Sequence, residues 1–307
     1  MSFLPNLYLG TSIAISWAWG TSLILGMQIA QTKGVGAFLL WAAANCLTLV
    51  LFGQLYKRGV ITEKILEKPG IRPAMLVIQC FCLLIQMKVL YDVLLPFCAS
   101  QLVAQVMTSM VGILFVLAMF RRGLSTSVLT DNFQGALTIA ALVGMLGACL
   151  YQAAPNVPLP SSDGDAMLWA SWSGCILLSG IITDLQHWQR AKLDTHRYAF
   201  ETAAGLFALY LSLVFVLSTF QLSALAQGLL LVAVLGVTTS TIDSIAVALH
   251  TMAGKKIGTA VGVLLCITWS LFVSVGLLSL WSYAGIFRVA LAVVILSLGI
   301  YSYRRLR

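Results

Sequence analysis

Charged residues are scarce in this sequence. Only 9% of its 307 residues are Asp, Glu, Lys or Arg, whereas a soluble domain carries about 25%. Apolar residues make up 60% of the chain, and the mean hydropathy is +0.97. Apolar runs of about 20 residues, long enough to cross a bilayer, recur along the chain. The composition therefore excludes an ordinary soluble domain and predicts an all-α polytopic membrane protein.

Sequence patterns of catalysis and of metal binding are also missing. The apolar runs contain no His-x-x-x-His, no Gly-x-Ser-x-Gly and no Glu-rich pair. Cys80 and Cys82 are two residues apart, not a CxxC, and no His is near them. We therefore expect no enzyme activity, and free buried thiols rather than disulfides or a metal centre. The start, MSFLPNLYLG, lacks the basic region of a signal peptide, so the first helix is expected to remain.

Ten apolar runs are candidate transmembrane helices. They cover residues 8–32, 35–56, 72–96, 99–120, 126–151, 166–187, 197–220, 226–252, 257–277 and 280–303. The basic residues test this count, because Lys and Arg accumulate in cytoplasmic loops. With the N-terminus inside, fifteen of the eighteen Lys and Arg are cytoplasmic and only Lys33 lies in an outside loop. The fifteen are Lys57, Arg58, Lys64, Lys68, Arg72, Arg121, Arg122, Arg190, Lys192, Arg197, Lys255, Lys256, Arg304, Arg305 and Arg307.

This distribution predicts a multi-pass protein of a bacterial-type plasma (inner) membrane, with both termini cytoplasmic. The net charge of +8 follows from topology, so the lipid bilayer is the expected partner and no nucleic acid is needed. Two basic residues fall within spans. Lys88 is four residues from Asp92, so these two are expected to pair near the outer face. Arg288 is expected to snorkel from the outer part of the last span.

Ten spans divide into two halves of five, which must then insert with opposite orientations. Inverted-repeat transporters have this arrangement, with their sites at the membrane midplane on interrupted helices. We place the first repeat at 1–151, an outside loop at 152–165 and the second repeat at 166–307. The opening spans of the halves share Ser-Trp and a mid-span Gly, in SWAWGTSLILG and SWSGCILLSG. We expect the two helices to unwind near 18–20 and 173–180.

Four segments together resemble the sodium/solute symporter family. They are SWAWGTSLILGMQIAQTKGVGAFLLWAAANCLTLVLFG (16–53), LTDNFQG (129–135), DLQHWQRA (184–191) and TSTIDS (239–244). The first is similar to the branch that includes urea and polyamine symporters. The resemblance implies a five-plus-five inverted-repeat (LeuT-type) fold and sodium-coupled transport. Family members usually have thirteen or more spans, whereas this chain resembles the ten-helix core alone, which leaves oligomeric state, regulation and transport itself open.

The resemblance also implies a sodium site between the first and eighth core helices. By position, Ser240 and Thr241 give side-chain oxygens, and Ile15, Ala18 and Val237 give backbone carbonyls. Sodium needs about five or six oxygens, which hydroxyls and exposed carbonyls supply. The alternative is that these hydroxyls bond only to their own helix, as is common in membranes.

The solute is expected beside the sodium, at the two helix breaks. Candidate residues are Trp17, Trp19 and Ser22 on the first span, Trp41 on the second, and Ser179 and Gly180 on the sixth. The aromatic rings can stack on a planar or cationic solute, although each Trp alone is better explained by helix packing. Some family branches carry an Asp in helix one where this chain has Trp17, so an acid-dependent amine contact is not expected there.

Four charged residues are candidates for coupling or gating: Asp131, Asp184, Arg190 and Asp243. Asp131 is interpreted as a carboxylate at the start of the fifth span, where it suits a helix N-terminus. Asp184, with Arg190, is expected to latch the cytoplasmic end of the sixth. Asp243 follows Ser240 by three residues and shares its face. It either balances the ion's charge, carries a proton, or is a structural carboxylate bonded to a hydroxyl.

The sequence thus favours a sodium-driven symporter of a small polar solute, with sodium as the only bound ion and no organic cofactor. A urea-like or amine solute ranks slightly ahead of an amino acid or a carboxylate. The alternative is a non-transporting membrane sensor or receptor built on the same core. Sodium-dependent uptake of a solute separates the two.

Overall fold

The computed structural model describes residues 3–121, 123–194 and 198–305, and this part of the chain is helical without a β-strand. Arg122, Arg197 and Arg307, used in the topology argument, lie outside the described residues. The helices are α1 (Phe3–Lys57), α2 (Ile71–Leu94), α3 (Gln101–Arg121), α4 (Leu124–Tyr151), α5 (Gly164–Thr183), α6 (Leu185–Ala191), α7 (Ala199–Ser218), α8 (Ala224–Ala253), α9 (Lys255–Thr268) and α10 (Leu277–Arg305). Short 3-10 turns are η1 (Glu63–Ile65), η2 (Leu95–Phe97) and η3 (Trp269–Phe272).

Within the described ranges, nine helical segments are long and apolar enough to cross a membrane. The prediction of an all-α polytopic membrane protein is therefore confirmed. The predicted runs 8–32 and 35–56 both fall in α1, whose apolar part, Pro5–Lys57, has 53 residues. At 1.5 Å per residue a straight helix of that length would extend about 80 Å, far beyond a hydrocarbon core of about 30 Å.

A turn at Gly34 divides α1 into two helices. Gly34 has φ 86° and ψ 175°, a conformation that glycine adopts without steric cost. The loop before α5 packs against this turn, where the Ser162 hydroxyl accepts a hydrogen bond from the Ala37 amide at 2.8 Å. A Cβ on Gly34 would lie 2.8 Å from the Ser162 nitrogen. The turn therefore needs glycine for both its backbone angle and its close neighbour.

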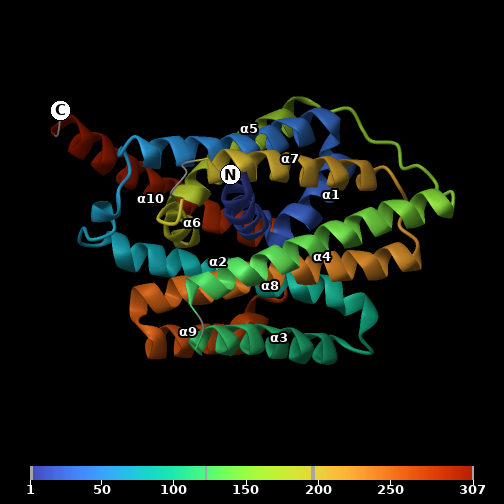
Figure 1. Ribbon diagram of the computed structural model, residues 1–307. Helices are drawn as coiled ribbons and strands as arrows, with labels where there is room; N and C mark the ends of the chain where they lie inside the picture. Colours follow the sequence, from blue (N-terminus) through green and yellow to red (C-terminus); the bar gives the residue numbers. More distant parts are fainter. Residues whose placement is uncertain (1–2, 122, 195–197, 306–307) are drawn as a thin grey trace.

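The helices form layers (Figure 1). In this view α1, α5 and α7 lie along the top, α2, α4 and α8 lie below them, and α3 and α9 form the bottom edge. Within their most apolar windows, 78% of α8 and 72% of α2 is buried, against 28% of α3 and 22% of α9. Protein rather than lipid therefore surrounds α8, and this explains how its polar stretch 238–244 is tolerated.

Segments predicted to lie on the same side of the membrane meet in the fold. Lys57, at the end of α1, pairs with Glu201 at the start of α7 at 2.6 Å. The Arg72 guanidinium, at the start of α2, donates to the Met252 carbonyl near the end of α8 at 2.8 Å. These basic segments lie at the left of Figure 1, and the long loop between α4 and α5 lies at the right. The helix ends are thus sorted as a multi-pass bundle requires.

Candidate functional site

The first helix is interrupted at Trp19. This residue has φ 41° and ψ 151°, which lies outside the helical region and is unfavourable for a side chain of this size. The following amide, that of Gly20, donates to the Gln86 side-chain oxygen of α2 at 3.1 Å. The carbonyls just before the break are then left without their helical amide partners. The unwinding predicted at residues 18–20 is present in the structure.

The second interruption lies at Asp184, between α5 and α6. The unwinding predicted at residues 173–180 is wrong, because α5 is helical through Thr183. The Ser179 hydroxyl donates to the Ile176 carbonyl within that helix at 2.7 Å and leaves it intact. Asp184 instead has φ −99° and ψ 106°, and its carboxylate accepts from the Gln186 amide as the N-cap of α6. The helix therefore breaks where a carboxylate caps a new first turn, and the shared Ser-Trp does not mark the break.

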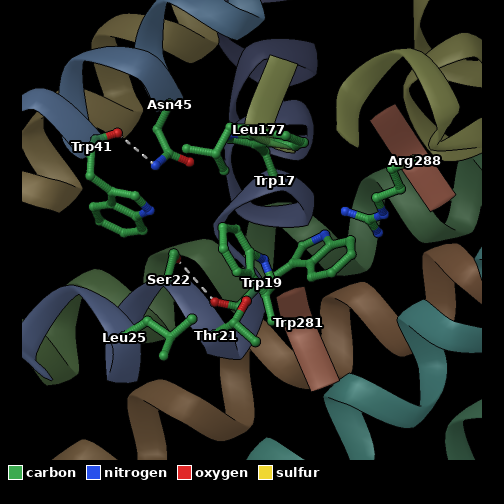
Figure 2. Close-up of a pocket in the computed structure, with 10 residues that line it drawn as sticks. All are labelled: Trp17, Trp19, Thr21, Ser22, Leu25, Trp41, Asn45, Leu177, Trp281 and Arg288. Carbon is green, nitrogen blue, oxygen red and sulfur yellow. Dashed lines mark hydrogen bonds between the residues drawn. The ribbon is translucent and has the colours of Figure 1, made fainter. Parts of the chain in front are cut away.

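A small cavity lies beside the break at Trp19 (Figure 2). Its volume is about 30 Å³. The lining residues come from α1, α5 and α10: Trp17, Trp19, Thr21, Ser22, Leu25, Trp41, Asn45, Leu177, Trp281 and Arg288. Four of the six predicted solute contacts, Trp17, Trp19, Ser22 and Trp41, are among them, whereas Ser179 and Gly180 are not.

Gly180 nonetheless shapes the cavity wall. A Cβ at this position would lie 3.2 Å from the Arg288 Nη1 and 3.5 Å from the Trp17 ring. The bare backbone of α5 therefore leaves room for both side chains. Ser179 has no such role, since its hydroxyl is engaged within α5.

Arg288 does not snorkel to the interface. Its side chain is 4% exposed and points toward the tryptophans of the cavity (Figure 2). The guanidinium carbon lies 4.6 Å from the Trp19 ring centroid, and Nη2 donates to the Cys82 sulfur at 2.6 Å. The snorkelling prediction failed because α10 turns this residue inward, where an aromatic face stabilises the cation. The other intramembrane cation behaves as predicted, since Lys88 pairs with Asp92 at 2.5 Å.

Thr21, Asn45 and Trp281 also line the cavity without having been identified from the sequence. Arg288 carried the clearest available signal, because an ionisable residue inside a span is a functional candidate by default. Thr21 lies two residues after the broken position. Asn45 and Trp281 carry no local pattern, since only helix packing brings them to the cavity.

A buried ion pair joins α6 to α4. The Arg190 Nη2 lies 2.5 Å from Asp131 Oδ2, and both side chains are fully buried. Asp131 also accepts from the hydroxyls of Ser12 at 2.5 Å and Ser240 at 2.6 Å. Arg190 further donates to Ser12 and to Ser244, each at 2.8 Å. We call this set of five residues, from α1, α4, α6 and α8, the Asp131 network.

Two sequence interpretations of these acids need correction. Asp131 does not cap a helix N-terminus, because α4 begins at Leu124 and its first turn holds no acidic residue. It lies farther along the helix, where Arg190 compensates its charge. Asp184 does not act together with Arg190 as one latch. It caps α6 locally, while Arg190 and Gln189 reach other helices, the latter through a 2.7 Å bond to Thr251.

Asp243 adjoins the Asp131 network. Its carboxylate accepts from Ser127 at 3.1 Å and from Thr130 at 2.8 Å, both on α4. Ser240 reaches Asp131 on the same helix, so the predicted shared face of Ser240 and Asp243 is correct. These hydroxyl bonds fit a structural carboxylate, and the carboxylate can also balance a cation or hold a proton.

The predicted sodium ligands are all buried where α1 meets α8. Ser240 donates its hydroxyl hydrogen to Asp131, which leaves the oxygen lone pairs free to face a cation. Ala18 lies directly before the Trp19 break, where a carbonyl loses its helical amide partner, whereas Ile15 fits less well because residues 16–18, which its helical bond spans, keep helical angles. Val237 fits less well, because its carbonyl accepts from the Thr241 hydroxyl at 2.9 Å in addition to the helical amide bond.

Comparison with known proteins assigns no family: no protein-family profile matches the sequence, and no curated protein matches it significantly. The site is therefore interpreted from its own residues.

Proposed function

We propose that this protein is a sodium-coupled secondary transporter of a small polar solute that works by alternating access. In this proposal the ten spans form two inverted halves, 1–151 and 166–307, with α1 counted twice and α5 and α6 counted as one span. The breaks at Trp19 and Asp184 support it, since each half then contributes one interrupted helix beside the same cavity.

One observation carries the coupling to a cation. Two buried carboxylates, Asp131 and Asp243, lie around a single arginine, Arg190. With both acids ionised, this group has a net charge of −1 in a region without solvent. A buried charge is tolerated when it is compensated. A monovalent cation beside Ser240 supplies that compensation through oxygens, the ligands that sodium prefers.

Ser240 links the proposed ion to the helix contacts. Its hydroxyl bonds to Asp131, and the same carboxylate holds Arg190 of α6. An ion that draws the Ser240 oxygen toward itself therefore changes the contact that holds α6 against α4. Ion occupancy and α6 position are then coupled in both directions, as coupling between two sites requires.

The test of sodium coupling is binding of radioactive sodium to the purified protein. Ser240→Ala and Thr241→Ala each remove one oxygen, and loss of a bond to a charged group costs about 1.5–3 kcal/mol. Sodium affinity should fall by about one to two orders of magnitude. Ser212→Ala is the matched control, because its hydroxyl is exposed and bonds only to the Ala208 carbonyl of its own helix. Equal sodium affinity in all three variants would remove the sodium site.

Proteoliposomes test transport itself. Uptake of a panel of labelled small solutes is measured with and without an inward sodium gradient, and with a proton gradient in its place. Sodium-driven uptake is the expected result. Uptake driven by protons alone, and abolished by Asp243→Asn, would assign coupling to a proton on Asp243 instead.

The alternative function is a non-transporting sensor. The small cavity, about 30 Å³, favours it, because it has room for about two or three waters and leaves little space for a solute that is to be carried. A sensor binds sodium or solute without moving either across the membrane. Binding without uptake of any solute in the proteoliposome panel would select this function.

A further inference from the structure

The cavity is rich in hydrogen-bond donors that have no acceptor. The indole nitrogens of Trp17, Trp19 and Trp41 are buried without a partner, and so is the Nε of Arg288. These four N–H groups come from residues that line one cavity, and each side chain is at most 5% exposed. Buried donors are almost always paired, so four unpaired donors around one space call for an explanation.

The cavity offers no carboxylate to satisfy them. Its lining within the described residues contains no Asp and no Glu, and the polar members besides the donors are Thr21, Ser22 and Asn45. Arg288 forms no ion pair within 4.0 Å among the described residues. Asp184 is close enough to interact electrostatically with Arg288, but its oxygens are taken by the Gln186 amide and side chain. Arg288 is therefore the one charged residue in the cavity lining within the described part of the chain.

From these donors and this charge we infer that the transported solute carries a carboxylate, which binds in this cavity to Arg288 and the tryptophan N–H groups. A carboxylate has two oxygens that accept several hydrogen bonds and pairs with the planar guanidinium. A cationic solute would lie against the Arg288 guanidinium and meet no carboxylate in the described lining. The inference rests on the proposed transport function, and it reverses the sequence-based preference for a urea-like or amine solute.

The structure also limits the size of the solute. The cavity of about 30 Å³ holds about two or three waters, so only a short carboxylate can enter with small movements of the lining. Gly180 marks one wall, where its bare backbone faces Arg288 Nη1 and the Trp17 ring. Trp41 lies across the cavity from Arg288 in Figure 2, so the lining presents donors from opposite sides.

Three ligands of equal size and shape test the charge preference. Acetate, acetamide and acetamidinium are planar, with the same number of heavy atoms, and differ in charge. Each is titrated into the purified protein at constant sodium and constant chloride, with tryptophan fluorescence and calorimetry as readouts. A ligand of four heavy atoms reaches a dissociation constant on the order of millimolar, so titrations extend to about ten times that concentration.

Acetate should bind, acetamide should bind at least about tenfold more weakly, and acetamidinium should not bind. Acetamide or acetamidinium binding as tightly as acetate overturns the inference, and so does the absence of acetate binding. Complete displacement of acetate by chloride at equal concentration would assign the donors to a halide ion and also overturn it.

Single-residue variants then test whether acetate binds in this cavity. Arg288→Gln should weaken acetate binding about ten- to a hundredfold, because a charge-assisted bond is lost. Trp41→Phe keeps the ring, removes one neutral donor, and should weaken binding about two- to tenfold. Trp172→Phe is the control, since Trp172 is 44% exposed on α5 and lies outside the cavity lining. If Arg288→Gln does not fold, the Trp41 and Trp172 variants still decide.

The inference and the proposed function fail in different ways. Radioactive sodium binding is measured in parallel on the native protein and on Arg288→Gln, where it should persist. Acetate binding without sodium binding would refute sodium coupling and keep the carboxylate site. Sodium-driven uptake of a neutral or cationic solute, with no response to acetate, would keep the transporter and refute the carboxylate site.

Discussion

Replacement of Asp131 by Asn is the most informative perturbation of the Asp131 network. Asn keeps the shape of the side chain but removes the charge, and its single oxygen can accept from only one of the Ser12 and Ser240 hydroxyls, which bond to different oxygens of Asp131. Arg190 then remains fully buried, with hydroxyls and the Gln186 carbonyl as its contacts and no carboxylate at 2.5 Å. The variant therefore isolates the charge of the pair from its packing.

The expected loss is large because the pair has no access to water. Removing one partner of a buried ion pair costs about 3–5 kcal/mol, since the other charge is left uncompensated. Arg190→Gln should cost a similar amount. If the two residues acted independently, the double variant would lose about 6–10 kcal/mol. Because neither charge of the pair is left in the double variant, we expect it to lose no more than either single variant, at most about 3–5 kcal/mol.

The assay is reversible unfolding in mixed micelles at increasing dodecyl sulfate, followed by tryptophan fluorescence, with thermal midpoints in detergent as a second readout. A control pair is Lys57 and Glu201, whose side chains are 15% and 28% exposed. Its variants, Lys57→Gln and Glu201→Gln, should each cost less than Asp131→Asn, because water reaches part of that pair.

Additive free-energy losses would refute a direct interaction between Asp131 and Arg190. If the free-energy losses of Asp131→Asn and Arg190→Gln sum to that of the double variant within about 0.5 kcal/mol, the two residues do not interact in the folded protein. A loss for Asp131→Asn no larger than that of Lys57→Gln would likewise show that Asp131 is not buried against a cation.

Three further predictions concern the backbone and the topology. Gly34→Ala should lower the unfolding free energy by about 1–2 kcal/mol, because Ala resists φ 86° and its Cβ would crowd Ser162. The control Gly147→Ala, at a helical position with open space, should be neutral or slightly stabilising. Equal thermal midpoints for the two variants would contradict the turn at Gly34. Asp184→Ala should lower the unfolding free energy by about 1 kcal/mol, because α6 loses its N-cap, and Asp184→Asn should recover most of that loss in the same assay. Equal losses for the two variants would show that the charge of Asp184 matters more than its capping hydrogen bond. A cysteine at Ser161 should react with an impermeant maleimide from outside intact cells and a cysteine at Lys64 should not, and the reverse labelling would invert the topology.

The helices were predictable because the bilayer imposes a simple length and polarity rule. Every predicted run lies mainly in helix, although the sixth crosses the break at Asp184 and the ninth extends past α9, and the turn inside α1 falls in the gap between the first two runs. The breaks were harder to predict. The one at Trp19 was expected, but the one at Asp184 depends on a carboxylate capping α6, which outweighed the similarity between two Ser-Trp pairs.

The polar contacts could be predicted only in part. The i, i+4 pair Lys88–Asp92 follows from helix geometry alone. Arg190 and Asp131 are 59 residues apart, and Arg288 and Cys82 are 206 residues apart, so no local pattern links them. The direction that Arg288 faces depends on the rotation of α10 about its axis, and packing sets that rotation.

The enclosed position of α8 has a consequence for how the protein is made. The partners of Asp243 lie on α4, and Thr130 precedes it by 113 residues. A carboxylate at the centre of an inserting helix costs about 2.5–3.5 kcal/mol by itself. Asp131 faces the same difficulty earlier, since Arg190 and Ser240 are synthesised after it. The first helices to enter the membrane therefore carry polar side chains whose partners have not yet been synthesised, and α6 and α8 supply those partners only late in synthesis. Truncated chains that end before α8 should accordingly be recognised as incomplete and degraded.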